Sequence, residues 1–66
     1  MMHRRHREDV LVRRNVMVET IPSGHPVELE AGMLAQITQA LGSSFTLLVE
    51  GQLMRLKGAD ADAIGK

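Results

Sequence analysis

The 66-residue sequence contains no cysteine, and Phe45 is its single aromatic residue. Without cysteine the chain has no means to form disulfides, thiolate zinc sites or self-ligated iron–sulfur clusters. This absence is consistent with a reducing compartment. The core must then be built from aliphatic residues and methionine, and we expect Met17, Met33 and Met54 to fill gaps in it.

Long apolar runs are also missing. No window approaches the roughly 18 apolar residues of a membrane span, and the Arg-rich start is not followed by the apolar stretch of a secretory signal. We therefore expect a soluble, cytoplasmic protein without membrane contact. A chain this short buries only about 60% of its unfolded surface, and small domains often gain support from a partner chain. We expect a homo-oligomer, or attachment to a larger protein.

Charge is balanced overall but is unevenly distributed. The formal net charge is zero. Residues 1–14 carry a balance of +3, from five arginines against Glu8 and Asp9, and the remainder carries −3. A basic arm on an acidic body can contact nucleic acid, an anionic surface or an acidic subunit. We interpret residues 1–9 as a flexible basic arm and residues 10–66 as one small domain.

Turn residues recur about every ten residues and separate short apolar runs. Pro22-Ser23-Gly24 is typical of a turn, because proline presets the backbone and glycine is favoured at its end. Gly42-Ser43-Ser44 is a second turn, and Glu50-Gly51 is short enough for a tight hairpin. The runs between them predict strands at 10–12, 16–21, 27–29, 45–49 and 52–56.

The segment 29–41 has two interpretations. Leu29, Met33, Ile37 and Leu41 recur every four residues, which favours a helix from about residue 30 to 41. Alternation of apolar residues over 33–37 favours a strand, less cleanly. Gly32 weakens a helix interior by roughly 1 kcal/mol relative to alanine. Periodicity alone leaves both structures open.

The number and spacing of the strands favour a small antiparallel β-barrel or sandwich of five or six short strands. A closed barrel would also remove the exposed edges of a flat sheet. After the final strand, Asp60 is placed to cap a short helical turn over 61–64, and Gly65 to end it. The sequence thus predicts an all-β domain with a short C-terminal helical turn.

No catalytic arrangement is visible. Ser23, Ser43 and Ser44 would act as nucleophiles only beside a poised base, and the sequence has no Gly-x-Ser-x-Gly motif. The glycines do not form a phosphate-binding Gly-x-x-x-x-Gly-Lys loop. We predict no catalytic residue and no enzymatic activity.

The sequence groups too few potential ligands for a metal site. His3 and His6 supply two imidazoles, whereas a zinc site needs three or four ligands, and the arginines between them repel a cation. His25 stands alone in a turn. Asp60 and Asp62 lack the further oxygen ligands of a calcium loop. We predict no metal and no cofactor.

A nucleic-acid-binding barrel is the alternative function. Small barrels bind single strands with aromatic side chains in a basic groove, whereas this chain has one aromatic and an acidic body. Phosphate contacts would make affinity fall steeply with salt, so a titration with single-stranded oligonucleotides tests this alternative. Its candidate contacts are the arginines of the arm: Arg4, Arg5, Arg7, Arg13 and Arg14.

From about Val10 to Gly65 the sequence resembles the N-terminal module of the SufT family, accessory proteins of the SUF iron–sulfur cluster assembly system. The resemblance lies in Ile-Pro-Ser-Gly-x-Pro-Val-x-Leu at 21–29, Ala-Gly at 31–32 and Ile-Thr-Gln-Ala-Leu-Gly at 37–42. It continues in Ser-Phe-Thr at 44–46, Gly-x-Leu-x-Arg at 51–55 and Asp-Ala-Asp-Ala-Ile-Gly at 60–65. Since family members are rich in Val and Thr between the glycines, the resemblance favours a strand at 33–41, after a turn at Ala31-Gly32.

The resemblance implies a non-catalytic protein-interaction or oligomerisation module that is accessory to iron–sulfur cluster assembly, with assembly proteins as partners. Family members continue into a second domain, to which the cluster-related chemistry is expected to belong. Ser43, Phe45 and Lys57 depart from the family pattern, which usually has glycine, tyrosine and an acidic residue there. Four polar positions match it and are candidates for a contact surface, or for hydrogen bonds that fix the closing turn: Gln39, Arg55, Asp60 and Asp62.

Overall fold

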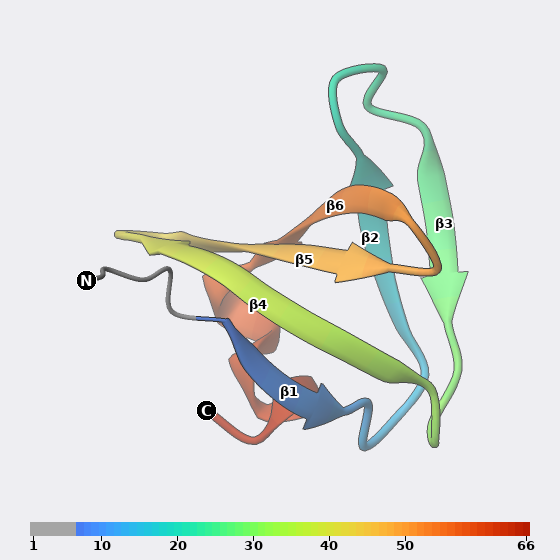
Figure 1. Ribbon diagram of the computed structural model, residues 1–66, viewed down its shortest axis with the longest axis vertical. Coiled ribbons are helices and arrows are strands. Elements are labelled where there is room, and N and C mark those ends of the chain that lie inside the picture. Colours follow the sequence, from blue (N-terminus) through green and yellow to red (C-terminus); the bar gives the residue numbers. More distant parts are fainter. Residues whose placement is uncertain (1–6) are drawn as a thin grey trace, which may run out of the picture.

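The computed structural model describes residues 7–66, which form six strands and one 3-10 helix (Figure 1). The strand order in the sheet is β1-β4-β5-β6-β2-β3, and every neighbouring pair is antiparallel. The elements are β1 (Glu8–Leu11), β2 (Val16–Thr20), β3 (Pro26–Leu29), β4 (Leu34–Leu41), β5 (Ser44–Val49), β6 (Gln52–Lys57) and the helix η1 (Gly58–Ile64).

The predicted all-β antiparallel fold with a C-terminal helical turn is confirmed, but the closed barrel is not. The sheet curves strongly (Figure 1), yet its hydrogen-bonded order ends at β1 on one side and β3 on the other. The two edge strands are short and are not paired with each other. The sheet therefore keeps two edges that the sequence argument had expected closure to remove.

The core lies on the inner face of the sheet. Leu29, Leu47 and Leu56 are almost completely buried. Ala63 and Ile64 are also buried, and η1 packs against β5 and β6. Burial of a leucine side chain contributes roughly 1.5–3 kcal/mol, so these aliphatic contacts hold the sheet together. The rest of the core is Val12, Val16, Val18, Ala35, Ile37, Val49 and Met54.

Residues 34–41 form a strand, which resolves the ambiguity in favour of β4. Ala35 and Ile37 are buried, whereas Leu34 and Leu41 are exposed. The register shifts between Ile37 and Gln39, so that Ile37 pairs with Leu47 and Gln39 with Thr46. This bulge shifts the alternation by one residue, so that Leu41 is exposed although it is four residues after the buried Ile37.

The Glu50-Gly51 hairpin is confirmed. It joins β5 to β6 and leaves Val49 paired with Gln52. Glu50 has φ 50° and Gly51 has φ 80°, so both central residues lie in the left-handed region. A two-residue turn of this kind matches the twist of the flanking strands. Glutamate adopts this conformation less readily than asparagine or glycine.

Two local predictions were wrong. Glu8 and Asp9 belong to β1 rather than to a flexible arm; Asp9 pairs with Gln36, whose Nε2 donates to Asp9 Oδ1 at 2.9 Å. Met17 is 54% exposed and fills no core gap, although Met54 is buried and Met33 packs against the core. The rest of the predicted arm, residues 1–6, lies outside the described residues.

Asp60 interrupts η1 with a non-helical backbone (φ −103°, ψ 17°), but its side chain binds Arg14 rather than capping the turn that follows. Lys57 is the N-terminal cap and makes no side-chain hydrogen bond there. The Gly58 N–H donates instead to the Ser43 carbonyl at 2.6 Å. Gly65 ends the turn as predicted, with φ 80°, and its N–H donates to the Asp62 carbonyl at 3.1 Å.

Candidate interaction surface

Gln39 and Arg55 lie on the outer face of the sheet, two strands apart. Gln39 on β4 is opposite Thr46 on β5, which is in turn opposite Arg55 on β6. Glu19 on β2 follows in the same row, opposite Arg55. Neighbouring strands are about 4.8 Å apart, so the row is a polar strip across four strands. The two predicted residues are thus on one face without direct contact.

Asp60 and Asp62 lie elsewhere, in η1, and both bind Arg14. Arg14 Nε and Nη2 donate to the two carboxylate oxygens of Asp62, each at 2.9 Å, and Nη2 also donates to Asp60 Oδ1 at 3.0 Å. Arg14 belongs to the link between β1 and β2, so these bonds fasten that link to η1. Two roles were considered for Asp60 and Asp62: a contact surface, or hydrogen bonds that fix the closing turn. The bonds to Arg14 correspond to the second.

The arrangement stabilises the charged forms of both partners. Hydrogen bonds from Arg14 lower the pKa of Asp62 from its ordinary value of 3.8, and bonds to Asp62 and Asp60 raise the pKa of Arg14. The three side chains are partly to largely exposed, at 45%, 33% and 67% for Arg14, Asp60 and Asp62. Solvent screens such pairs, so their contribution to stability is small.

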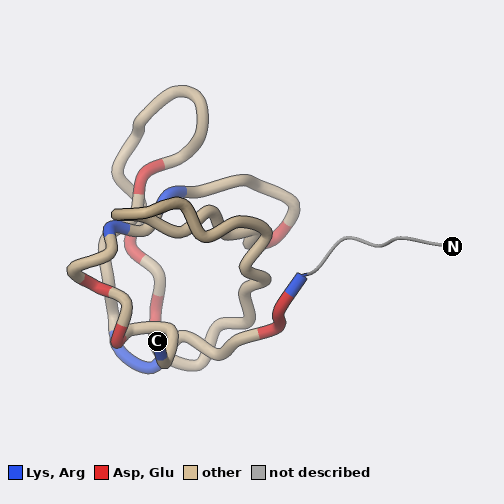
Figure 2. Tube along the Cα trace, turned by 90° about the vertical axis from the view of Figure 1, so that its left-hand side faces the viewer, with Lys and Arg blue, Asp and Glu red and all other residues tan. Residues whose placement is uncertain are grey.

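The described arginines of the nucleic-acid alternative do not form one basic patch. Arg14 is paired with two carboxylates, and Arg13 lies across Gly65, where an added Cβ would stand 2.8 Å from Arg13 Nη2. Figure 2 shows Lys and Arg at separate points along the trace, with Asp and Glu between them. Arg7 is exposed at the start of the described chain, and Arg4 and Arg5 lie outside it.

The sequence analysis missed a cluster of exposed leucines on the outer face, here called the leucine cluster. Leu34 is 69% exposed, and its neighbour Leu11 across the β1–β4 pair is 56% exposed. Leu53 is 43% exposed opposite the half-buried Leu48, which lines one hollow together with Leu34. The available signal was the continuous run Leu47-Leu48-Val49, since consecutive apolar residues in a strand must face both sides.

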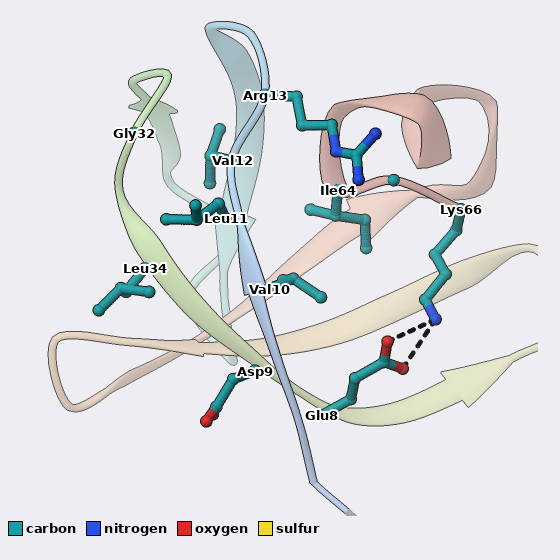
Figure 3. A pocket seen from close by; sticks show the side chains of 11 residues that line it. Glu8, Asp9, Val10, Leu11, Val12, Arg13, Gly32, Leu34, Ile64 and Lys66 are labelled. Carbon is teal, nitrogen blue, oxygen red and sulfur yellow. Dashed lines mark hydrogen bonds and ion pairs between the residues drawn. The ribbon is translucent and has the colours of Figure 1, made fainter.

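A groove of about 650 Å³ runs along β1 and is lined also by Leu34 of β4 and by the C-terminal turn (Figure 3). Val10 and Ile64 project toward its interior, and Arg13 lies at one end. At the other end Lys66 Nζ donates to both carboxylate oxygens of Glu8, at 2.8 and 2.7 Å. The groove therefore separates an edge strand of the sheet from the C-terminal turn.

Other kinds of site find little support in residues 7–66. Within them no three His, Asp or Glu side chains are grouped so as to hold a metal ion. His25 is an exposed residue whose N–H donates to Thr20 Oγ1 at 3.1 Å, as suits a turn; His3 and His6 are not among the described residues. This part of the chain also has no helix of the length and hydrophobicity needed to cross a membrane.

Comparisons with protein-family models, with curated proteins and with solved structures find no match to this chain.

Proposed function

We propose that this chain is a non-catalytic protein-interaction module whose contact surface is the leucine cluster. The observation that supports the proposal is the position of four leucines on the outer face of one continuous sheet, from β1 to β6. Single exposed leucines are ordinary, but contiguous exposed apolar groups mark interaction surfaces. These leucines contribute little to the fold, because the core is on the opposite face.

The polar strip beside the cluster supplies the rim of the proposed interface. Gln39 and Arg55 are exposed on the same face, and arginine is enriched at interfaces where aspartate and glutamate are depleted. An apolar centre with a polar margin is the usual anatomy of a protein contact. Asp60 and Asp62 are assigned to the fold, since both bind Arg14.

The proposed setting is iron–sulfur cluster assembly, which rests on the resemblance of residues 10–65 to the SufT family. The module would bind assembly proteins and would itself hold no cluster, because the sequence has no cysteine. Its non-catalytic character rests on the missing nucleophile–base and phosphate-loop patterns in the sequence.

Capture of purified iron–sulfur assembly proteins on the immobilised chain tests the proposal. The double variant Leu34→Lys with Leu53→Lys is expected to retain its circular dichroism spectrum and to lose capture. Met17→Lys is the matched control, because the exposure of Met17 lies between those of Leu34 and Leu53 but Met17 is on β2, away from the cluster. Capture by the double variant equal to that of the wild type, or no capture by the wild type, would contradict the proposal.

A further inference from the structure

The β1 edge carries backbone groups that no described segment satisfies. The Val12 N–H donates to the Met33 carbonyl at 2.9 Å, so Val12 faces β4. Residues of an antiparallel strand alternate between its two sides, so Val10 also faces β4, while Asp9, Leu11 and Arg13 face away. Consistently, the Arg13 N–H donates to Ala63 in η1 at 2.7 Å.

Of these three outward-facing residues, Arg13 already has a partner for its N–H, whereas Asp9 and Leu11 are left to pair with a further strand. Ala63 takes the N–H of Arg13, but in residues 7–66 no backbone group bonds the N–H or the carbonyl of Asp9 and Leu11. The groove shows that the space beside them is open. An edge of this kind is a template for another strand.

We propose that this edge pairs with β1 of a second copy, antiparallel about a two-fold axis at Val10. The inference goes beyond the proposed function, because it concerns self-pairing at an edge rather than binding through the leucine cluster. In this register Asp9 of each copy exchanges two hydrogen bonds with Leu11 of the other, which gives four in all. It sets the two Asp9 side chains diagonally across the axis, about 7–8 Å apart, rather than directly opposite each other.

Neighbouring registers are disfavoured by contacts already present. Centring the pair on Leu11 requires the Arg13 N–H, which Ala63 occupies. Centring it on Asp9 sets two carboxylates directly opposite each other, which is destabilising. The register about Val10 uses only the unfilled groups and avoids that repulsion.

The opposite edge of the sheet does not favour the same pairing. By the same alternation, Pro26 and Glu28 of β3 face away from β2, because the Thr20 N–H donates to the His25 carbonyl across that pair. Proline has no N–H to donate. A symmetric β3 contact centred on Glu28 would oppose glutamate with glutamate. The two edges thus differ in their capacity for self-pairing.

Pairing of β1 edges would also extend the leucine cluster. Leu11 and Leu34 are neighbours on the outer face, and the second copy would bring its own pair alongside them. The result is one apolar surface shared by both subunits. The dimer therefore enlarges the contact surface of the proposed function rather than hiding it.

Cysteine crosslinking tests this proposal directly, because the chain has no cysteine of its own. Val10→Cys places the two thiols on the proposed axis in a non-hydrogen-bonded pair, where Cα atoms are about 4.5 Å apart and a disulfide is allowed. Oxidised glutathione is the oxidant. Val27→Cys is the matched control, since Val27 is a half-buried valine of the other edge strand.

We expect most of the Val10→Cys protein to become a disulfide dimer at concentrations where Val27→Cys remains monomeric. Sedimentation of the variant Asp9→Pro, which removes an outward-facing N–H donor, is expected to show about tenfold weaker dimerisation than the wild type. This second variant leaves the core untouched, so it still tests the proposal should Val10→Cys fold poorly.

The proposal is overturned by a Val10→Cys protein that crosslinks no better than Val27→Cys, or by an Asp9→Pro protein that dimerises as the wild type does. A monomer that still binds assembly proteins through Leu34 and Leu53 would refute the dimer and support the proposed function. A β1 dimer that binds no assembly protein would support the dimer and refute the proposed function.

Discussion

The centre of the sheet and its β1 edge are held together by different forces. In the centre, Leu47 on β5 and Leu56 on β6 have no exposed surface. At the edge, the fastening contacts are exposed ion pairs: Arg14 with Asp60 and Asp62, and Lys66 with Glu8. Since solvent screens exposed ion pairs and leaves them little net stabilisation, stability resides in the centre. The edge is left with backbone groups that nothing in residues 7–66 pairs and that a partner can use.

The sharpest test of this contrast compares two leucines. Leu47→Ala is expected to lower the free energy of unfolding by about 2–5 kcal/mol, because it leaves a cavity in the core. Leu34→Ala removes the same atoms from an exposed position, and its effect is expected to stay within about 0.5 kcal/mol. Urea denaturation followed by circular dichroism measures both.

Similar losses in the two variants would contradict the contrast. Ile37→Val offers a milder core change, of about 0.5–1.5 kcal/mol, in case Leu47→Ala does not fold.

The junction between β6 and η1 is expected to tolerate no added atom. A Cβ on Gly58 would stand 2.7 Å from the Ser43 carbonyl oxygen, a backbone atom. Gly58→Ala is therefore expected to cost about 1–3 kcal/mol, as overpacking does. Ala59→Ser at the next, exposed position is the control. A Gly58→Ala protein as stable as the wild type in urea would show that the junction is loose.

In the centre of the sheet, the β5–β6 hairpin has a glutamate, Glu50, at a turn position where asparagine is favoured. Glu50→Asn suits the positive φ of 50° at this position and is expected to raise stability by roughly 0.5–1 kcal/mol. Glu30→Asn, an exposed position outside the strands, should give no such gain. A rise in melting temperature for Glu50→Asn alone checks the prediction; equal or lower stability in both variants speaks against it.

At the edge, the pairing of Asp62 with Arg14 is expected to be sensitive to pH. Because the folded pKa of Asp62 is lowered, the stabilisation is complete above the unfolded pKa and is lost as pH falls through the folded value. The difference in melting temperature between wild type and Asp62→Asn should thus shrink below about pH 4.

Glu28→Gln serves as the control for Asp62→Asn, since Glu28 is an exposed carboxylate on the edge strand β3. A gap between wild type and Asp62→Asn that stays constant down to pH 2 would mean that the ion pair does not stabilise the fold.

Much of the fold could be predicted from turn residues. Gly24, Gly51 and Gly65 all have positive φ, a conformation that glycine adopts at little cost, and the strands between the turns followed. Whether the sheet closes into a barrel could not be predicted, because closure depends on whether its two edge strands come close enough to pair. The polar start of β1 was missed because an edge strand needs only one apolar face.

The candidate site was predicted less well. Spacing gave no sign that Arg14 would reach Asp60 and Asp62, which lie 46 and 48 positions away. The leucine cluster was overlooked because a run such as Leu47-Leu48 looks like core from sequence alone. Only the sheet assigns Leu47 to the inner face and Leu48 to the outer one.

Amide hydrogen exchange, followed residue by residue in dilute and in concentrated solution, tests most directly whether the centre is closed and the β1 edge open. Exchange reports the opening of each local hydrogen bond. We predict that Val10 and Leu47 are protected in both solutions, whereas Asp9 and Leu11 exchange quickly when dilute and become protected when concentrated. Asp9 and Leu11 amides as well protected as Val10 in the dilute protein would contradict the account.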